Sequence, residues 1–511
     1  MKLDKNSCLG KAYEKTLTGI LTHSLESHLQ SYTGENHDMW AEPEFTGKYV
    51  DVCTKYYKNT GNIDYLNRAK AVVDKICEVQ PEDGYIGGLM KKDRWENFDV
   101  WNQAFTILGL LSYYAQTKDK KALDAAEKCA FTIADHYMNN RGKNILDATN
   151  FGTQHISFLL VLPKLYKITG KKIYMDFMNF IANEVKNSDL NFFEFESILE
   201  LRSKKGIENF VVLMGMLEYA EIIGDSKIIE SVKKYWQQVN DTQIRNTGNG
   251  TVGEFWTENG NAPALLGADI KPNENCVAVG WMELSLMLFY IEQDTKYLDA
   301  IEKSVFNHLL GSLSEDGTDF AYYQPNYGRK VSTTEEAMYK CCRYRGFTFF
   351  AYLQDMLYYS DDEFIIPMIY QASEYEDEYV KIIQKTNYPF DTKIHFDIKT
   401  KKACNKKLKL KIPKWCKNYS LDKDYIYCDG YVILDCKDMN LEFNLESEIV
   451  KETGIIDGKE YVAYSKGPLL LAHEPDCKKP LYTTDGYKLK DYASAGRENE
   501  YMVWIPKKQE D

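Results

Sequence analysis

Tyr56-Tyr57-Lys58-Asn59-Thr60-Gly61-Asn62 is the stretch that decides the fold, because segments of the same kind recur through residues 56–362. In each copy one or two aromatic residues are followed by a polar turn, which is typical of the end of one helix and the start of the next. The tyrosines that precede successive turns are 57, 52, 53, 71 and 68 residues apart. The six copies begin at Tyr56, Tyr113, Tyr166, Tyr219, Tyr290 and Tyr358. Such repetition predicts a repeat architecture.

A step just above 50 residues suits two helices with their connections, so each copy marks one helical hairpin. Ile107, Leu110, Leu111 and Tyr114 follow the i, i+3, i+4, i+7 spacing of a helix face. Six hairpins around one axis form an (α/α)6 toroid, and an open solenoid of the same units is the alternative. We therefore predict a toroid over residues 1–362, in which the two longer steps add loops at one mouth.

The C-terminal part changes to an apolar period of two. Ile394, Phe396 and Ile398 alternate with polar residues, and similar runs are separated by turn signals such as Asp429-Gly430. Short alternating runs of this kind indicate antiparallel strands. The sequence thus predicts a mainly α chain with a β domain, namely an (α/α)6 toroid followed by an antiparallel β-sandwich over residues 363–511.

Composition limits the partners. The 511 residues include 63 basic and 76 acidic side chains, a net charge of −13, whereas phosphate affinity comes mainly from Lys and Arg, so nucleic acid is not an expected ligand. No apolar run is long enough for a membrane span or an export signal, so we expect a cytoplasmic protein. Twelve cysteines are then expected to stay reduced, and clusters among them suggest metal or catalytic sites.

Two short cysteine motifs fall in the two longer steps. Cys341-Cys342 is a vicinal pair, which can form only a strained bridge, and Glu274-Asn275-Cys276 precedes the long apolar segment 277–293. The first turn of a helix there would offer free backbone donors to anions. Three thiolates and one carboxylate make a reasonable tetrahedral zinc set. The alternative is two buried cysteines and an unrelated Glu-x-Cys run.

A glycine-rich segment, residues 247–256, lies just upstream and reads Thr-Gly-Asn-Gly-Thr-Val-Gly-Glu-Phe-Trp. Its carboxylate, Glu254, stands beside two aromatic residues, and a partly apolar pocket would let such a group donate a proton. Glu254 is therefore the candidate general acid. Glu258, four residues on, is the alternative, and the plain interpretation of either residue is a surface acid. The segment lacks the Lys-Ser/Thr ending of a phosphate-binding loop.

These features together resemble glycoside hydrolase family 127, the β-L-arabinofuranosidase-like enzymes, along nearly the whole chain. The order and approximate spacing of several short motifs are shared, although each motif alone is weak. Besides the Glu-x-Cys run and the cysteine pair, they are Gln80…Asp83-Gly84-Tyr85-Ile86, Asp316-Gly317 before Tyr322-Tyr323, Lys411-Ile412-Pro413-Lys414-Trp415 and Lys466-Gly467-Pro468.

The resemblance implies a retaining glycoside hydrolase that acts on plant-type glycans or oligosaccharides through a zinc-bound cysteine nucleophile. It implies a catalytic toroid followed by a β-sandwich. Cys341 is the implied nucleophile, Glu254 the acid/base, and His155 and Tyr322 are implied sugar contacts. The implied Zn²⁺ ligands are Glu274, Cys276, Cys341 and Cys342.

The chain departs from the family where two further sugar-contacting histidines are often found, because Phe105 and Lys205 stand there. We therefore expect a sugar other than plain β-L-arabinofuranose, and an acidic one if Lys205 faces the pocket. Two other functions remain open. One is a zinc-free toroid glycosidase or lyase that uses a carboxylate pair such as Glu254 and Glu258, and the other is a non-catalytic sugar-binding protein. A homo-oligomer is compatible with the sequence, and no membrane partner is expected.

Overall fold

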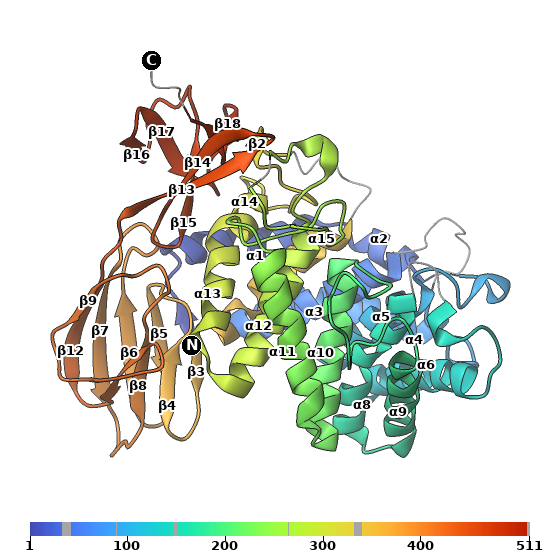
Figure 1. Cartoon of the computed structure of the whole chain (residues 1–511). Coiled ribbons are helices and arrows are strands. Elements are labelled where there is room, and N and C mark those ends of the chain that lie inside the picture. The colour runs from blue at the N-terminus through green and yellow to red at the C-terminus, as the bar shows by residue number, and fades with distance from the viewer. Residues whose placement is uncertain (33–41, 88, 148–151, 264, 332–339, 508–511) are drawn as a thin grey trace.

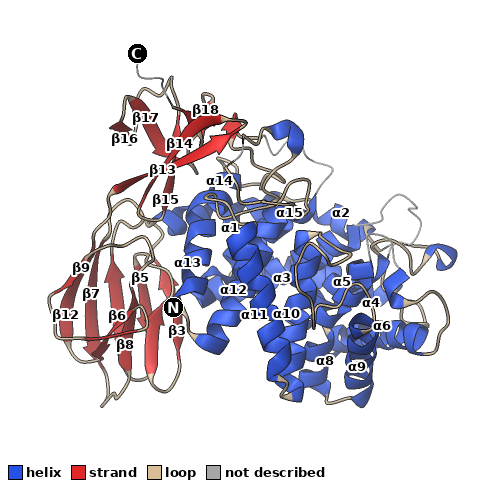
Figure 2. Ribbon diagram, viewed as in Figure 1, coloured by secondary structure: helices blue, strands red, loops and turns tan. Residues whose placement is uncertain are grey.

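The computed structural model places a body of helices beside two separate groups of strands (Figures 1 and 2). Among the described residues, no helix is long and apolar enough to cross a lipid bilayer. The structure describes residues 1–32, 42–87, 89–147, 152–263, 265–331 and 340–507.

An inner ring of helices forms the centre of the helical body. Each inner helix packs on the next, and α15 packs on α3, which closes the ring as predicted for a toroid. Inner helices such as α10 and α12 are buried on nearly every side, so their sequences are apolar all round. The ring consists of α3 (Glu42–Thr60), α5 (Asp99–Thr117), the broken segment of α7 (Thr153–Ile156), a 3₁₀ turn (Ser157–Leu160) and α8 (Leu162–Thr169), then α10 (Gly206–Ile223), α12 (Asn275–Glu292) and α15 (Lys340–Tyr352).

An outer layer of helices covers this ring, one on each inner element. The outer helices bury one face only, and polar residues occupy the other. In order around the ring they are α4 (Ile63–Val79), α6 (Lys120–Met138), α9 (Lys172–Lys186), α11 (Ser226–Thr242), α13 (Thr295–Lys303) and, on α15, α1 (Cys8–Thr22). Shorter helices are α2 (Leu25–Gln30) and α14 (Leu310–Ser312), and the remaining helical turns span Lys91–Asp93, Ile145–Asp147, Ala268–Ile270, Ser304–Leu309 and Leu353–Met356.

The repeated turn works through local chemistry. Gly170 and Gly224 end α8 and α10 in the left-handed conformation, at φ 67° and 70°, which glycine adopts without steric cost. Asp119 and Asp225 then begin the next helices by accepting a hydrogen bond from a backbone N–H in the first turn. The sequence could therefore place these hairpins because both signals act within a few residues.

The sixth copy, which begins at Tyr358, was a wrong prediction. Tyr358–Ser360 forms strand β3, which pairs with β4 (Phe364–Pro367) rather than joining two helices. The outer helix that completes the ring is α1, at the N-terminus. Ring closure brings the two ends of the helical region together, and no short-range pattern in the sequence records that contact.

Two sheets follow the toroid and form the predicted sandwich region, with cores that are continuous with the main core. All their strand pairs are antiparallel except β4 with β8. The N-terminal β1 joins the first sheet through β5. That sheet has the order β1 (Lys2–Leu3), β5 (Ser373–Glu376), β6 (Val380–Lys385), β7 (Lys393–Thr400), β12 (Met439–Leu445), β9 (Tyr419–Leu421). The second has the order β10 (Ile426–Cys428), β11 (Tyr431–Asp435), β8 (Lys407–Lys411), β4, β3.

The last part of the chain forms a third sheet with its own small core, away from the other two (Figure 1). Strand β2, which belongs to the loop before α15, pairs with β18, so this sheet touches the helical body. Its strands are β13 (Ile449–Ile456), β14 (Lys459–Lys466), β15 (Leu469–His473), β16 (Tyr482–Thr484), β17 (Tyr487–Asp491), β18 (Tyr501–Met502), β19 (Ile505–Pro506) and β2 (Tyr327–Gly328).

Candidate active site

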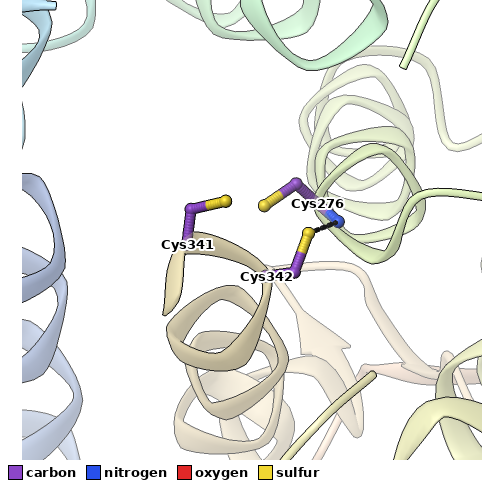
Figure 3. Close-up of side chains that lie close together, drawn as sticks. All are labelled: Cys276, Cys341 and Cys342. Carbon is purple, nitrogen blue, oxygen red and sulfur yellow. Dashed lines mark hydrogen bonds between the residues drawn. The ribbon is translucent and has the colours of Figure 1, made fainter. Parts of the chain in front are cut away.

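Three cysteine side chains meet where two neighbouring inner helices begin (Figure 3). Cys276 lies in the first turn of α12, and Cys341 and Cys342 lie in the first turn of α15. Their sulfur atoms all lie within 4.8 Å of one another. The backbone N–H of Cys276 donates to Sγ of Cys342 at 3.2 Å, and the Asn275 amide donates to the Cys342 carbonyl at 3.0 Å. The two predicted cysteine motifs thus form one cluster.

Glu274 is the fourth candidate ligand and lies beside this cluster. It is buried, its Oε1 lies 3.7 Å from Sγ of Cys342, and its Oε2 has no hydrogen-bond partner among the described residues. Burial, together with the nearby Glu254, raises the pKa of Glu274 well above its ordinary value. A buried carboxylate with a vacant oxygen beside three thiols is unfavourable unless a cation compensates it. Zinc prefers such a set of one carboxylate and three thiolates, so these residues fit a zinc ion.

The three thiols differ in their electrostatics. Hydrogen bonds from Cys276 and Cys342 lower the pKa of Cys341 well below its ordinary value, and Lys48 and Tyr322 act in the same direction. Burial raises the pKa of Cys276 and of Cys342. Cys341 is also partly exposed, whereas the other two are buried. Of the three, Cys341 is therefore the thiol best suited to reach and attack a substrate.

Glu254 faces the cluster from the glycine-rich loop. Its Oε1 accepts hydrogen bonds from the Tyr322 hydroxyl at 2.6 Å and the Tyr323 hydroxyl at 2.9 Å, and its Oε2 lies 2.9 Å from Nζ of Lys205. Its backbone has φ 77°, which is strained for a residue with a side chain. Such strain persists only where the surrounding structure enforces it, and it is concentrated at functional sites.

The loop that carries Glu254 is fixed to the metal-ligating segment. The Asn249 amide donates to the backbone carbonyl of Glu274 at 2.6 Å, and the Glu274 N–H donates to the Thr251 hydroxyl at 3.3 Å. A Cβ at Gly250 would lie 2.2 Å from the Gln243 carbonyl oxygen, so this position requires glycine. The glycines therefore allow close packing of the loop rather than phosphate binding.

Two family models match the chain. The model described as "Beta-L-arabinofuranosidase, GH127 catalytic domain" matches residues 1–355, and the model of the GH127 middle domain matches residues 365–425. The chain belongs to glycoside hydrolase family 127. It is accordingly a glycoside hydrolase, and its substrate is a carbohydrate.

Individual family members are distant in sequence. A non-reducing end β-L-arabinofuranosidase of Bifidobacterium longum subsp. longum is 21% identical over 478 residues, which cover 79% of this chain and 70% of that protein. The solved structure of a family 127 β-L-arabinofuranosidase from Geobacillus stearothermophilus T6 has a TM-score of 0.72 at 17% identity, covering 97% of this chain and 94% of that one. A second structure, of a family 127 β-arabinofuranosidase, has a TM-score of 0.75 at 19% identity, covering 99% and 94%. These structures share the fold of this glycoside hydrolase.

His155, an expected sugar contact, has no recorded contact with the cluster among the described residues. Its Nδ1 lies 2.8 Å from the Tyr137 hydroxyl, and burial lowers its pKa to about 3. The two residues before His155 contact a carboxylate of the site instead. Thr153 and Gln154 donate hydrogen bonds to Glu208 at 2.5 and 3.0 Å. The sugar-binding role of His155 stays a prediction.

Two groups of this family 127 site were missed from the sequence. Buried Glu44 and Lys48 pair within α3, and Nζ of Lys48 lies 4.4 Å from the centre of the Phe105 ring. Buried Glu208 lies 3.5 Å from Nζ of Lys205. The signal that could have revealed Lys48 is its i, i+4 pairing with Glu44 at the start of an inner helix. Glu208 offered a similar signal, because it is a charge in the first turn of α10 directly before the apolar run 210–217.

Proposed function

We propose that this enzyme is a retaining β-L-arabinofuranosidase-like hydrolase that uses Cys341 as nucleophile and Glu254 as acid/base, with plant-type glycans or oligosaccharides as substrates. The observation that carries the proposal is that one residue, Tyr322, lies beside both candidate groups. These are Cys341, a thiol of lowered pKa, and Glu254, whose backbone is strained. The Tyr322 hydroxyl donates to Oε1 of Glu254 and is also close enough to Cys341 to lower the pKa of that thiol, with its one proton shared between the two groups.

The proposed reaction has two displacements. Sγ of Cys341 forms a bond to the anomeric carbon while the bond to the leaving oxygen breaks, and Glu254 gives its proton to that oxygen. Glu254 then takes a proton from water, whose oxygen bonds to the anomeric carbon as the sulfur–carbon bond breaks. Two inversions restore the original anomeric configuration, as in retaining enzymes that use two carboxylates.

Glu274, Cys276, Cys341 and Cys342 would hold a zinc ion in this proposal. When bound, zinc would favour the thiolate form of its ligands and make the Cys341 sulfur a better leaving group in the second step. The vacant, buried Oε2 of Glu274 supports the assignment. All twelve cysteines are free thiols, which supports a reducing, cytoplasmic location.

The zinc-free alternative relies on Glu258 as a second carboxylate. Glu258 is exposed, whereas Glu254 contacts both tyrosines and Lys205, so the geometry favours Glu254 as the proton donor. The idea of an acidic sugar loses support for a similar reason. The ammonium of Lys205 already has two carboxylate partners, Glu254 and Glu208, and would offer little charge to a third.

A panel of p-nitrophenyl glycosides that includes both arabinofuranose anomers tests the proposal. We expect slow hydrolysis of the plain β-L-arabinofuranoside, because Phe105 stands where the family often has a sugar-contacting histidine, and ¹H NMR should show that the first product keeps the anomeric configuration. Replacing Cys341 with Ala should abolish turnover, whereas Cys428→Ser, which changes an exposed cysteine, should not. Glu254→Gln should slow poor leaving groups far more than p-nitrophenol, because a good leaving group needs little protonation. An inverted first product would refute the cysteine nucleophile.

Elemental analysis provides a separate test of the metal. Purification under reducing, chelator-free conditions should yield about one zinc per chain, because four suitable ligands lie together. Cys276→Ala should lose that zinc, whereas Cys428→Ser should retain it. A wild-type protein without stoichiometric zinc that still hydrolyses glycosides would favour the zinc-free mechanism.

A further inference from the structure

We propose that Lys205 is a positioning residue that selects which oxygen of Glu254 carries the catalytic proton. The inference rests on the proposed function, because it assigns Lys205 a role in the proton transfer by Glu254. It also assigns a role to Lys205 at a position where related enzymes often have a sugar-contacting histidine. Lys205 thereby acts on the acid/base rather than on the sugar.

The backbone fixes Lys205 against Glu254. Lys205 and Phe255 form an antiparallel bridge, and the Gly206 N–H donates to the Glu254 carbonyl at 3.0 Å. The Trp256 N–H donates to the carbonyl of residue 204 at 2.9 Å. These bonds hold the start of α10 to the loop of Glu254 on both sides of the side-chain pair. The 2.9 Å contact between Nζ of Lys205 and Oε2 of Glu254 is therefore a built feature of the site.

A second carboxylate holds Lys205 from the other side. Glu208 lies 3.5 Å from Nζ of Lys205 and is itself fixed by hydrogen bonds from Thr153 and Gln154. Burial acts to lower the pKa of Lys205, but Glu208 and Glu254 outweigh it and raise that pKa above its ordinary value. Lys205 is thus a permanent cation in this position.

Donor and acceptor chemistry then distinguishes the two oxygens of Glu254. An ammonium has three donors and no acceptor, so a proton on Oε2 would point at another donor. Tyrosine hydroxyls can either donate or accept, so Oε1, which contacts Tyr322 and Tyr323, can carry the proton. Because Lys205 occupies Oε2, Oε1 is the oxygen of Glu254 that can hold and deliver the proton.

The charged groups around Glu254 should influence how the activity depends on pH. The titratable groups that face it are Lys205 and Glu208 at the start of α10, Tyr322 and Tyr323 in the loop before α15, and Glu274 before α12. Lys205 is the cation among these groups that contacts the carboxylate directly. Removing this cation should therefore change the pH dependence of activity, with the alkaline limb moving to higher pH.

Lys205→Met, Lys205→Arg and, as a matched control, Lys204→Met test the role. In Lys205→Met we expect kcat for an arabinofuranoside with a poor, alkyl leaving group to fall at least about tenfold, and kcat for the p-nitrophenyl glycoside to fall much less, with KM little changed. The pH limb at which activity on the alkyl glycoside is lost on the alkaline side should move up by about 1 pH unit. Lys205→Arg keeps a cation without acceptors, so it should recover part of the rate.

A role limited to stability would give a different pattern. It would lower the Tm and the activity on all substrates alike, without moving the pH limb. Lys204→Met should match the wild type, because residue 204 meets the loop through its backbone carbonyl, which the substitution keeps, whereas the side-chain contact with Glu254 comes from Lys205. Equal losses on both substrate types in Lys205→Met, or an unmoved pH limb, would overturn the proposal.

Crystal structures of Lys205→Met and Lys204→Met separate this inference from the proposed function. If the wild type hydrolyses no glycoside, the proposed function fails, but the position of Glu254 can still be compared. The Glu254 carboxylate should turn away from the two tyrosines in Lys205→Met and stay in place in Lys204→Met. A carboxylate that remains on both tyrosines without Lys205 would overturn the positioning role.

Discussion

The two tyrosines that donate to Glu254 offer a matched pair of substitutions. Tyr322→Phe and Tyr323→Phe each remove one hydroxyl from the same carboxylate oxygen and leave the ring in place. The Tyr322 contact is shorter, 2.6 Å against 2.9 Å, and Tyr322 is buried whereas Tyr323 is partly exposed. Only the hydrogen bond from Tyr322 is also among the causes that lower the pKa of Cys341. We therefore expect Tyr322→Phe to be the more damaging change.

The magnitude follows from the bond that is lost. A hydrogen bond to a charged group contributes about 1.5–3 kcal/mol, and about 1.4 kcal/mol is a factor of ten in rate. If the Tyr322 bond persists in the transition state, kcat/KM should fall by about ten- to a hundredfold in Tyr322→Phe. Water can replace the hydroxyl of the more exposed Tyr323, so Tyr323→Phe should cost less than about tenfold.

The assay is kcat/KM on a p-nitrophenyl and an alkyl arabinofuranoside, with the Tm of each variant as the check on folding. Two variants with equal kcat/KM, or a larger loss in Tyr323→Phe, would refute the reasoning that the shorter, buried contact of Tyr322 with Glu254 matters more.

Three further predictions concern stability and the proton donor. Burial lowers the pKa of three histidines to about 3, whereas an unfolded histidine has a pKa near 6.5, so each histidine should lower the free energy of unfolding by about 2 kcal/mol between pH 7.5 and 5. The residues are His28, His155 and His308. Buried carboxyls such as Asp99, whose pKa burial raises to about 6, act in the opposite direction, so the fall is compared between the wild type and His308→Gln. Urea titrations in which the variant loses as much stability as the wild type would contradict this. Gly47→Ala should lower the Tm in calorimetry and cost about 1–3 kcal/mol, because a Cβ would lie 2.3 Å from the Phe105 carbonyl oxygen where α3 packs on α5, and an unchanged Tm would show that the helices can separate freely. Glu258→Gln should keep kcat/KM within about twofold, since that side chain is exposed; a loss as large as in Glu254→Gln would reopen the choice of acid.

Much of the candidate site could be predicted from the sequence because its chemistry is concentrated in unusual local motifs. A vicinal cysteine pair and a Glu-x-Cys run are rare enough to stand out, and the structure places Cys276 beside Cys341 and Cys342 as expected. The partners of Glu254 were not predictable in the same way. Lys205 reaches it through an antiparallel bridge between segments 49 residues apart, and such a contact leaves no periodic trace in either segment.

The sequence by itself predicted the first five helical hairpins, the alternating strands and the cysteines that the structure brings together. Helix ends such as Gly170 and Asp225 are set by backbone conformation and capping within a few residues, so they act wherever the segment lies. The tertiary structure alone decided that α1 completes the ring, that Tyr358–Ser360 is a strand, and that Lys205 forms ion pairs with two carboxylates. These outcomes depend on packing and Coulomb energies between segments far apart in the chain, which are defined only once the ring has closed.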